Sequence, residues 1–275
     1  MPQPIHKTGL WKTLGQKAGA ISIANNLLAS FVPLSSNWSD PIWTASLQSP
    51  YPSLRGTNGL TFTSGPPGNF TFDGTDDFLG PPGGYSGNEF LVDAPDAYTF
   101  NQWVYLPNGW GSGTSKTHYL MYFFEDSSNY VMTYIQDQSM KIYSQTTGGG
   151  ALGPSSFTLA PNLVNNRNKW LYHTIAHNGS GLYKYYINGM FIDSINANYA
   201  PTKRSGSGSA HSTIVNIGKG RNLSSPGGAL YTSADVKVGH IQHYDHELGA
   251  GTIRQNYLAI ASPTDTRLYG DTTLV

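Results

Sequence analysis

The hydrophobic positions near the start of the chain predict an amphipathic helix over residues 8–31. Apolar side chains recur there at spacings of three and four residues, which is the period of one helix face. They are Leu10, Leu14, Ala18, Ile21 and Leu28, with Asn25 as the one polar residue on the stripe. Short coiled coils use a single Asn in this way to fix their register. The stripe therefore suits docking on a partner, packing on the chain's own domain or, with Trp11 and three lysines, lying on a membrane surface.

Beyond this segment the helical period disappears. Residues 33–67 are rich in Ser, Pro, Gly and Asn, which predicts an irregular connection giving way to short strands. The rest of the chain carries short aromatic and β-branched runs bounded by Asn, Asp, Ser or Gly, a pattern that predicts strands. The predicted strands are 98–106, 119–125, 130–136, 140–144, 170–176, 182–187, 190–195, one beginning at Ile214, and 236–244.

Turn sequences join three of these strands. Asn188-Gly189 is the strongest two-residue hairpin signal that a sequence offers, and residues 178–181 read Asn-Gly-Ser-Gly. A three-stranded meander is therefore expected over residues 170–195. Because so many short strands must bury one face against another layer, the predicted fold is all-β, a two-sheet antiparallel sandwich.

Composition narrows the possible partners. Only 12% of the 275 residues are charged, and 16 basic side chains balance 16 acidic ones, so no nucleic-acid partner is expected. The chain has no cysteine, which excludes disulfides, thiolate zinc sites and cysteine nucleophiles. The most apolar run, 18–34, is broken by Asn25, Asn26 and Pro33. We therefore expect neither membrane insertion nor a cleaved leader.

Three stretches together resemble the concanavalin A-like lectin/glucanase superfamily, in its laminin-G-like branch. Phe72-Asp-Gly-Thr-Asp-Asp-Phe-Leu79 resembles the first-strand signature of that family. The other two stretches resemble the central hairpin, at 170–179 and 185–189, and the closing strand with its short final helix, at 214–218, 238–249 and 252–257. The resemblance covers roughly residues 60–260. It implies a two-sheet jelly roll with a concave face that binds sugars in some members.

Asp73, Asp76 and Asp77 form the densest acidic group. Their carboxylates could contribute oxygens to a calcium ion, since hard cations take such ligands from turns. A turn whose Asp side chains bond their own backbone accounts for the same residues, and it is the interpretation we favour. No metal or other cofactor is assigned from the sequence, and calcium stays open.

The acidic and histidine residues do not form a recognisable catalytic or metal motif. The glucanases of the superfamily carry a Glu-x-Asp-x-(x)-Glu motif, which none of Glu89, Glu125 and Glu247 matches, so we expect no enzyme activity. His240 and His243 should point to opposite faces of a strand, because side chains alternate there. Singly hydrogen-bonded surface or core histidines are therefore expected instead of a metal site.

Aromatic residues in glycine-rich loops are the candidate binding residues. Tyr85 and Trp110 lie in Pro81-Pro-Gly-Gly-Tyr-Ser-Gly87 and Pro107-Asn-Gly-Trp-Gly-Ser-Gly113. Sugar rings stack on such side chains through their apolar faces, so a glycan site is one interpretation. A subunit interface, where Tyr and Trp are also enriched, is the other.

The leading hypothesis is a non-enzymatic viral structural protein: a capsid decoration, tail or fibre component of a phage virion. It rests on the resemblance of 241–257 to marine-phage versions of the domain, together with Met1 and the absence of a leader. Residues 1–45 are the predicted anchoring arm, 46–262 the jelly roll and 263–275 a tail. Leu10, Trp11, Leu14, Ile21 and Leu28 would dock on other virion proteins.

Assembly and host contact complete this hypothesis. We expect a homo-oligomer, with a cyclic trimer as one form, and the sandwich would project from the particle towards a host glycan. The alternative function is a carbohydrate-binding module of a bacterial surface or secreted protein. In that case the protein would be extracellular or at the cell surface, and the concave face or the loops with Tyr85 and Trp110 would hold the glycan.

Overall fold

The computed structural model describes the strands and the C-terminal helix of the protein together with several turns. The described residues are 27–31, 38–39, 42–44, 53–57, 59–64, 68–80, 97–108, 117–126, 129–136, 139–146, 149–158, 167–196, 214–221, 230–232, 236–244 and 246–260. All strand pairs among them are antiparallel.

The larger sheet has eight strands. They are β1 (Leu27–Phe31), β5 (Thr61–Thr63), β6 (Asn69–Phe72), β8 (Tyr98–Leu106), β13 (Lys169–His177), β14 (Leu182–Ile187), β15 (Met190–Asn196) and β19 (Val236–Tyr244). Their order is β15-β14-β13-β8-β19-β6-β5, and β1 also pairs with β19. One side of β19 therefore pairs with β8 along most of its length, while β6 and β1 share the other side.

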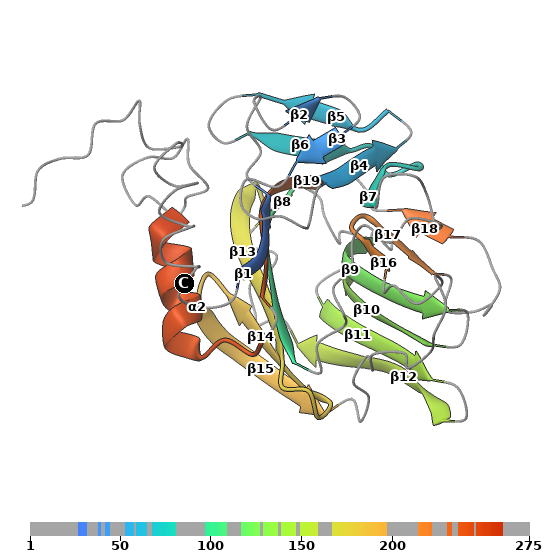
Figure 1. The fold of residues 1–275 in the computed structure, drawn as a ribbon, viewed down its shortest axis with the longest axis vertical. Helices are drawn as coiled ribbons and strands as arrows, with labels where there is room; N and C mark the ends of the chain where they lie inside the picture. The colour runs from blue at the N-terminus through green and yellow to red at the C-terminus, as the bar shows by residue number, and fades with distance from the viewer. Residues whose placement is uncertain are drawn as a thin grey trace, which may run out of the picture.

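A five-stranded sheet faces the larger one (Figure 1). Its strands are β9 (Thr117–Asp126), β10 (Asn129–Gln136), β11 (Ser139–Thr146), β12 (Gly149–Thr158) and β16 (Ile214–Asn216), in the order β12-β11-β10-β9-β16. Two small sheets complete the strands: β2 (Trp38–Ser39), β3 (Ile42–Thr44), β4 (Ser53–Thr57) and β7 (Phe78–Gly80), and the pair β17 (Lys219–Arg221) and β18 (Leu230–Thr232). A bridge between Leu79 and Ile217 connects β7 to the residue after β16.

The core lies between the two main sheets because alternate side chains of each strand point inward. Phe100 and Val104 of β8 pack there with Ile175 of β13, and Val131 and Ile135 of β10 come from the facing sheet. The predicted all-β two-sheet sandwich is thus confirmed. Within the described residues, no helix is long and apolar enough to cross a membrane.

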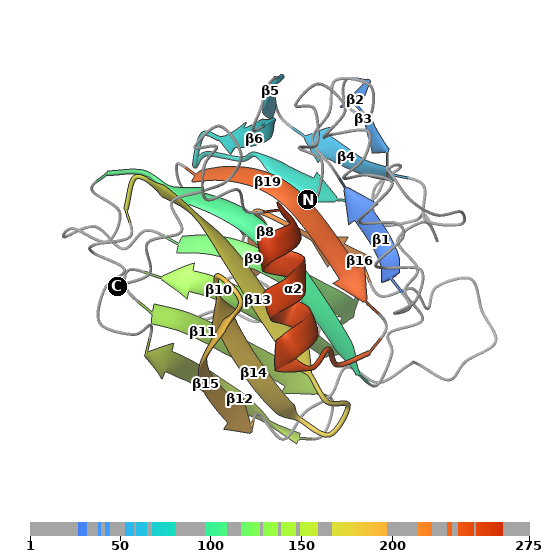
Figure 2. The same ribbon diagram turned by 90° about the vertical axis from the view of Figure 1, so that its left-hand side faces the viewer.

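The opposite face of the larger sheet is covered by helix α2 (Ala250–Ile260), as Figure 2 shows. The hairpin turn between β14 and β15 fixes its position. Arg254 donates from Nη1 to the carbonyl oxygen of Asn188 at 2.7 Å, and a Cβ on Gly189 would lie 2.9 Å from the Arg254 Cα. Gly189 also has a φ of +74°, which favours glycine. The turn therefore needs glycine both for its backbone and for the helix beside it.

Several predicted elements are confirmed at residue level. Strands 98–106, 182–187 and 236–244 coincide with β8, β14 and β19, and the other predicted strands lie within one or two residues of observed ones. The final helix expected near 252–257 is α2. The signature at 72–79 contains the end of β6, the turn expected at its Asp residues and the start of β7.

The N-terminal helix prediction is wrong at its end. Leu27–Phe31 forms β1, with Ser30 opposite Gln242 and Phe31 opposite Ile241 of β19. Pairing with an available sheet edge satisfies this backbone better than an isolated helix would, because isolated helices gain little in water. The rest of the predicted helix lies outside the described residues. At least β1 of the expected arm, residues 1–45, is thus part of the larger sheet, and the arm's boundary stays a prediction.

Candidate functional site

The docking and binding residues expected from the sequence fall mostly outside the described part of the chain. This holds for Leu10, Trp11, Leu14, Ile21, Tyr85 and Trp110. Leu28 lies in β1, where only its backbone is described. The segment with Tyr85 leads into β8 at Tyr98, and the segment with Trp110 leaves it after Leu106. These two segments therefore join opposite ends of a strand that is about 30 Å long.

The outward face of the larger sheet carries a continuous cross-strand row that the sequence did not reveal. Trp170 of β13 lies directly opposite Tyr105 of β8, which lies opposite Lys237 of β19. Lys237 in turn lies opposite Thr71 of β6. Directly paired residues share one face, and neighbouring strands lie about 4.8 Å apart, so the four side chains span about 14 Å. We call Trp170, Tyr105, Lys237 and Thr71 the aromatic row.

Contacts within the aromatic row hold its two rings in place. The Tyr105 and Trp170 ring centroids are 5.6 Å apart, with their planes inclined at 58°. Lys237 places its Nζ 5.5 Å from the centroid of the Tyr105 ring. The Tyr105 hydroxyl donates to Oδ1 of Asn168 at 2.6 Å. Lys237 is exposed and the other three members of the row are half-buried, so the rings are held in place while part of each reaches solvent.

Farther along the same face the aromatic side chains are buried under α2. Trp103 and Tyr172, the next outward residues of β8 and β13, pack with Tyr257 of α2. The Trp103 and Tyr257 rings stack with centroids 5.8 Å apart. The Tyr172 hydroxyl donates to Oε1 of Gln242 at 3.0 Å. These groups belong to the packing of the helix, and Trp170 borders their cluster while staying half-buried.

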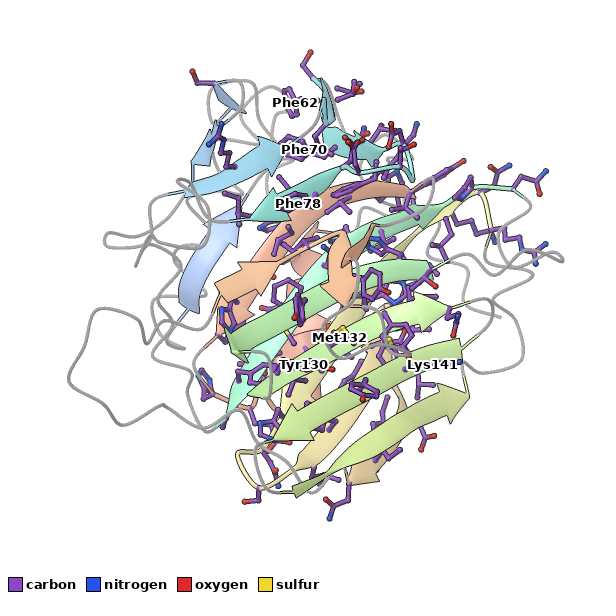
Figure 3. The ribbon with its side chains drawn as sticks, turned by 90° about the vertical axis from the view of Figure 1, so that its right-hand side faces the viewer. Phe62, Phe70, Phe78, Tyr130, Met132 and Lys141 are labelled. Atoms are coloured by element: carbon purple, nitrogen blue, oxygen red, sulfur yellow. The ribbon has the colours of Figure 1, made fainter. Side chains whose placement is uncertain are left out.

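A second aromatic group lies on the outward face of the smaller sheet (Figure 3). It consists of Tyr119, Tyr122, Tyr130, Met132, Tyr134 and Tyr143. All six are at most 7% exposed. Desolvation is the main cause that raises the pKa of Tyr134 to about 12, with a smaller effect of Tyr143. A surface buried to this degree offers no stacking platform in this conformation.

The buried histidines are parts of the core, as expected. His240 bonds the hydroxyl of Ser30 at 2.8 Å, and the His243 ring packs edge-on against Tyr98 and Phe100. Desolvation by burial lowers the pKa of His240 and of His243 to about 3, so both are neutral at physiological pH. Among the described residues, no histidine belongs to a group that could hold a metal ion.

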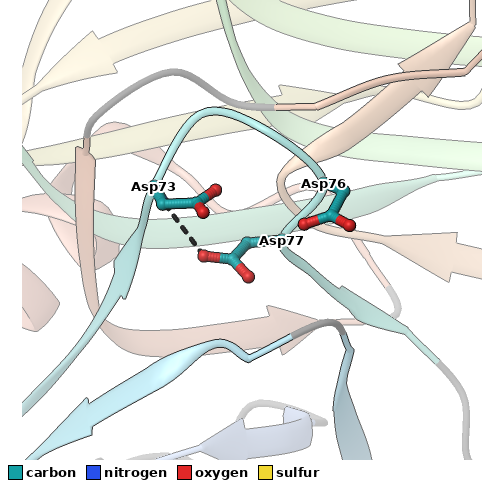
Figure 4. A group of neighbouring side chains, drawn as sticks. All are labelled: Asp73, Asp76 and Asp77. Carbon is teal, nitrogen blue, oxygen red and sulfur yellow. Dashed lines mark hydrogen bonds between the residues drawn. The ribbon is translucent and has the colours of Figure 1, made fainter.

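Asp73, Asp76 and Asp77 form the one candidate metal group in the described part of the chain. The turn that the sequence favoured is present: the backbone N–H of Thr75 donates to Oδ1 of Asp73 at 2.7 Å, and that of Asp73 donates to Oδ2 of Asp77 at 2.9 Å. The carboxylates nevertheless lie together (Figure 4), with one oxygen from each within 4.8 Å of the others.

The chemistry of the aromatic row suits a ring-shaped polar ligand. Tyr and Trp offer apolar faces for stacking, while their polar atoms bond outward. Lys237 adds a positive charge and three donors, which match a carboxylate on the ligand. The sequence contained one signal for this site: Tyr105 and Trp170 are aromatic residues at the ends of two predicted strands, 98–106 and 170–176. Which strands pair, and in which register, could not be read from it.

Comparison with known proteins extends the description of the fold. No family model and no curated protein matches the chain. Among solved structures, the receptor-binding domain of botulinum neurotoxin D is similar over 86% of this chain and 53% of its own length, with 14% identity and a TM-score of 0.60. The chain thus spans about half the length of the structures it matches.

Two further similar structures contain bound partners. One is the botulinum neurotoxin serotype D ligand-binding domain in complex with N-acetylneuraminic acid, with 13% identity, a TM-score of 0.59 and coverage of 86% and 52%. The other is the binding domain of botulinum neurotoxin DC in complex with rat synaptotagmin II, with 14% identity, a TM-score of 0.57 and coverage of 85% and 51%. At these identities the similarity establishes the β-sandwich fold.

Proposed function

We propose that this chain is a non-enzymatic glycan-binding β-sandwich and that it binds an acidic sugar on the aromatic row. The main support is the fold, which is similar over 86% of the chain to a domain crystallised with N-acetylneuraminic acid. The row adds the chemistry that such a ligand needs: half-exposed Trp170 and Tyr105 as stacking surfaces, and Lys237 as a partner for the carboxylate.

The position of the row explains why the site would be ready before a sugar arrives. The two rings are carried by the adjacent strands β13 and β8 and not by a loop. The hydrogen bond from Tyr105 to Asn168 fixes the Tyr105 ring further. Ordering these side chains on binding therefore costs little conformational entropy, which favours affinity.

A glycan array tests this proposal. The purified full chain, the Trp170→Ala variant and the Phe191→Ala variant are applied to neutral and sialylated glycans. Phe191 is the matched control, because it is an exposed aromatic residue of β15 outside the row. We expect the full chain and Phe191→Ala to retain sialylated glycans, and Trp170→Ala to lose about five- to thirtyfold in affinity, as a lost stacking contact of about 1–2 kcal/mol would give.

Two results would contradict the proposal at different levels. An array on which the full chain retains no glycan contradicts the function. Retention that Trp170→Ala leaves unchanged contradicts the site. In that second case, Tyr85→Ala and Trp110→Ala tell whether either loop residue carries the binding. Because their segments join opposite ends of β8, each variant is measured separately.

We further propose that the module belongs to a virion appendage and attaches through residues 1–26. Residues 1–26 are the part of the expected arm, residues 1–45, that precedes β1, since Leu27–Phe31 pairs with β19 in the larger sheet. Size exclusion with light scattering on the full chain and on a chain lacking residues 1–26 tests it. An oligomer that becomes a folded monomer supports attachment through this segment. The same oligomeric state for both chains would contradict a role of residues 1–26 in self-assembly.

The non-enzymatic part of the proposal has its own test. Among the glutamates, Glu247 is bound in an ion pair with Lys184, at 2.6 Å between Oε1 and Nζ. That pairing leaves its carboxylate less available for acid–base chemistry. We expect no turnover of a panel of β-glucans and sialosides by the full chain. Release of sugar from any of them would overturn the assignment.

A further inference from the structure

The turn between β13 and β14 folds the side chain of Asn178 back over the peptide group that follows it. Oδ1 of Asn178 accepts the backbone N–H of Ser180 at 2.8 Å. Such an Asx turn copies the shape of a backbone turn, so it brings the carboxamide carbon of Asn178 close to the backbone nitrogen of Gly179. We propose that this nitrogen attacks the carboxamide carbon in the folded protein, so that Asn178 is converted to aspartate and isoaspartate.

The reaction takes place between two groups of the chain, and water is the only other reactant. A bond forms between the Gly179 nitrogen and Cγ of Asn178, and the bond from Cγ to the side-chain nitrogen breaks. The proton of the Gly179 N–H leaves with that nitrogen as ammonia, and a cyclic imide remains. Water then opens the imide at either carbonyl carbon, which gives aspartate in one case and isoaspartate in the other.

Two backbone donors lie where negative charge develops in this reaction. Besides the N–H of Ser180, that of Leu182 donates to Oδ1 of Asn178, at 3.1 Å. Attack on Cγ turns this oxygen into an oxyanion, and preorganised N–H donors stabilise such a charge. The hairpin holds the donors in place, because the Asn178 N–H donates to the carbonyl oxygen of Leu182 at 3.2 Å. The folded turn therefore contains an oxyanion hole for this step.

A histidine lies at the proton that must leave. The Gly179 N–H donates to Nδ1 of His177 at 3.3 Å, and the Gly181 nitrogen lies 3.1 Å from Nε2. A neutral imidazole accepts on only one nitrogen, so the tautomer protonated on Nε2 is the one that can take the Gly179 proton. Asn178 and Gly179 are half-buried and Ser180 is exposed, so water can reach the imide.

A second Asn-Gly pair in the described part of the chain, Asn188-Gly189, has a different geometry. Oδ1 of Asn188 accepts the N–H of Tyr172 on β13 at 2.9 Å, so its carboxamide is directed at the neighbouring strand. Asn188 is 2% exposed, and its carbonyl oxygen accepts from Arg254 at 2.7 Å. Turning this side chain towards Gly189 would break a buried hydrogen bond. Asn188 should therefore stay intact, and it is a control within the same chain.

Mass spectrometry of tryptic peptides tests the proposal after incubation of the full chain at neutral pH, folded and in urea. Residues 170–184 contain Asn178, and residues 185–203 contain Asn188. In urea both turns are lost, so both pairs react as in an unstructured chain. We expect Asn178 to react at least about tenfold faster in the folded chain than in urea, because a positioned base and an oxyanion hole each accelerate such steps. Asn188 should react more slowly in the folded chain.

Two results of this comparison would overturn the proposal. One is a folded-state rate at Asn178 that is equal to its rate in urea or below it, since the turn would then protect the residue. The other is reaction of Asn188 as fast as Asn178 in the folded chain. Both results come from the unsubstituted protein, so they do not depend on the folding of a variant.

Variants identify the base. His177→Gln should slow the folded-state reaction of Asn178 at least about tenfold and leave its rate in urea unchanged. His173→Gln is the matched control, because His173 is buried on the same face of β13 but bonds the Tyr185 hydroxyl, at 2.5 Å. Circular dichroism shows whether each variant is folded. An unchanged folded-state rate in His177→Gln would overturn the assignment of His177 as the base.

The proposed reaction is independent of glycan binding. Trp170 and Asn178 lie at opposite ends of β13, about 26 Å apart at the usual rise of an extended chain. Trp170→Ala should therefore leave the rate at Asn178 unchanged, and a fully reacted chain should retain the same glycans as a fresh one.

Discussion

Two tryptophans on the same face of the same sheet have different environments. Trp103 of β8 is 1% exposed and stacks on Tyr257 of α2, whereas Trp170 of β13 is half-exposed beside Tyr105. They lie on adjacent strands, where Trp103 pairs with Tyr172 and Trp170 pairs with Tyr105. The two tryptophans thus share the residue type, the sheet and the face of the sheet. The difference comes from α2, which covers one end of this face and not the other.

This comparison separates structural aromatic residues from candidate binding residues. Burial of a Trp in a packed cluster stabilises the fold, whereas a half-exposed Trp on rigid strands can give up part of its hydration to a ligand. The covered end should therefore respond to substitution mainly in stability, and the aromatic row mainly in binding. Four measurements test this contrast, beginning with the one that should affect stability most.

Acid should destabilise the whole fold by protonating the buried histidines. Burial lowers the pKa of four histidines from 6.5 to about 3: His118, His173, His240 and His243. Their folded-state pKa lies below the unfolded value, so their contribution to stability is complete above about pH 6.5 and is lost as the pH falls towards 3. Each should therefore destabilise the fold progressively as the pH falls through this window. Urea denaturation between pH 7.5 and pH 4 should show a steep loss of stability.

A matched pair of histidine variants checks the source of this acid sensitivity. His243→Gln removes a fully buried imidazole and should flatten the pH dependence while lowering stability at neutral pH. His246→Gln, at a half-buried position outside the core, is the matched substitution. A stability that does not vary between pH 6.5 and pH 4 would show that these rings are not held in their neutral form by burial.

Tryptophan substitution tests the contrast directly. Trp103→Ala should destabilise the fold by about 3–5 kcal/mol, because it leaves a cavity between β8, β13 and α2. Trp170→Ala should cost less, about 1–2 kcal/mol, since its side chain is only half-buried. Urea denaturation at pH 7.5 provides both values, and the glycan array provides the binding of each folded variant. Equal losses of stability would mean that the aromatic row is as structural as the cluster under α2.

The sequence predicted the long strands of the two main sheets except β12, but not their contact with the helix. Alternation and turn residues placed β8, β14 and β19 to the residue, since aromatic and β-branched runs between Asn and Gly have few alternative structures. β12 was missed because its sequence, with three glycines and Pro154, has low strand propensity, and only its pairing with β11 makes it a strand. Long-range pairing is invisible to a local pattern.

The candidate site could be predicted only in its residue types. The sequence pointed to aromatic residues as sugar platforms and chose Tyr85 and Trp110 because glycine-rich loops are usually exposed. Trp170 and Tyr105 lay in predicted strands and were not singled out as binding residues. Trp103 is buried because Tyr257 of α2 packs on it, whereas Trp170 only borders that cluster, and this difference depends on where a distant helix docks. The same dependence explains why Leu27–Phe31, with its helical spacing, became a strand beside β19.

Weakening the attachment of α2 should affect the covered cluster around Trp103 and leave the aromatic row unchanged. Gly189→Ala places a methyl group 2.9 Å from the Arg254 Cα and forces an L side chain into a φ of +74°. We expect a loss of about 1–3 kcal/mol. Near-ultraviolet circular dichroism should report a changed environment of Trp103, while glycan binding by the row stays within about twofold. Gly59→Ala is the control, because that glycine also has a positive φ but has open space around it. Equal losses would assign the effect to the backbone alone.

The smallest effect on stability should come from Lys237→Gln. Lys237 is exposed, and its contact with the Tyr105 ring at 5.5 Å is weak in water, so the free energy of unfolding should change by less than about 0.5 kcal/mol. Binding should respond differently, because the variant keeps both stacking rings and loses only the positive charge. Retention of sialylated glycans should fall, while any weaker retention of neutral glycans stays the same. If both classes fall equally, Lys237 supports the shape of the row and not the recognition of a carboxylate.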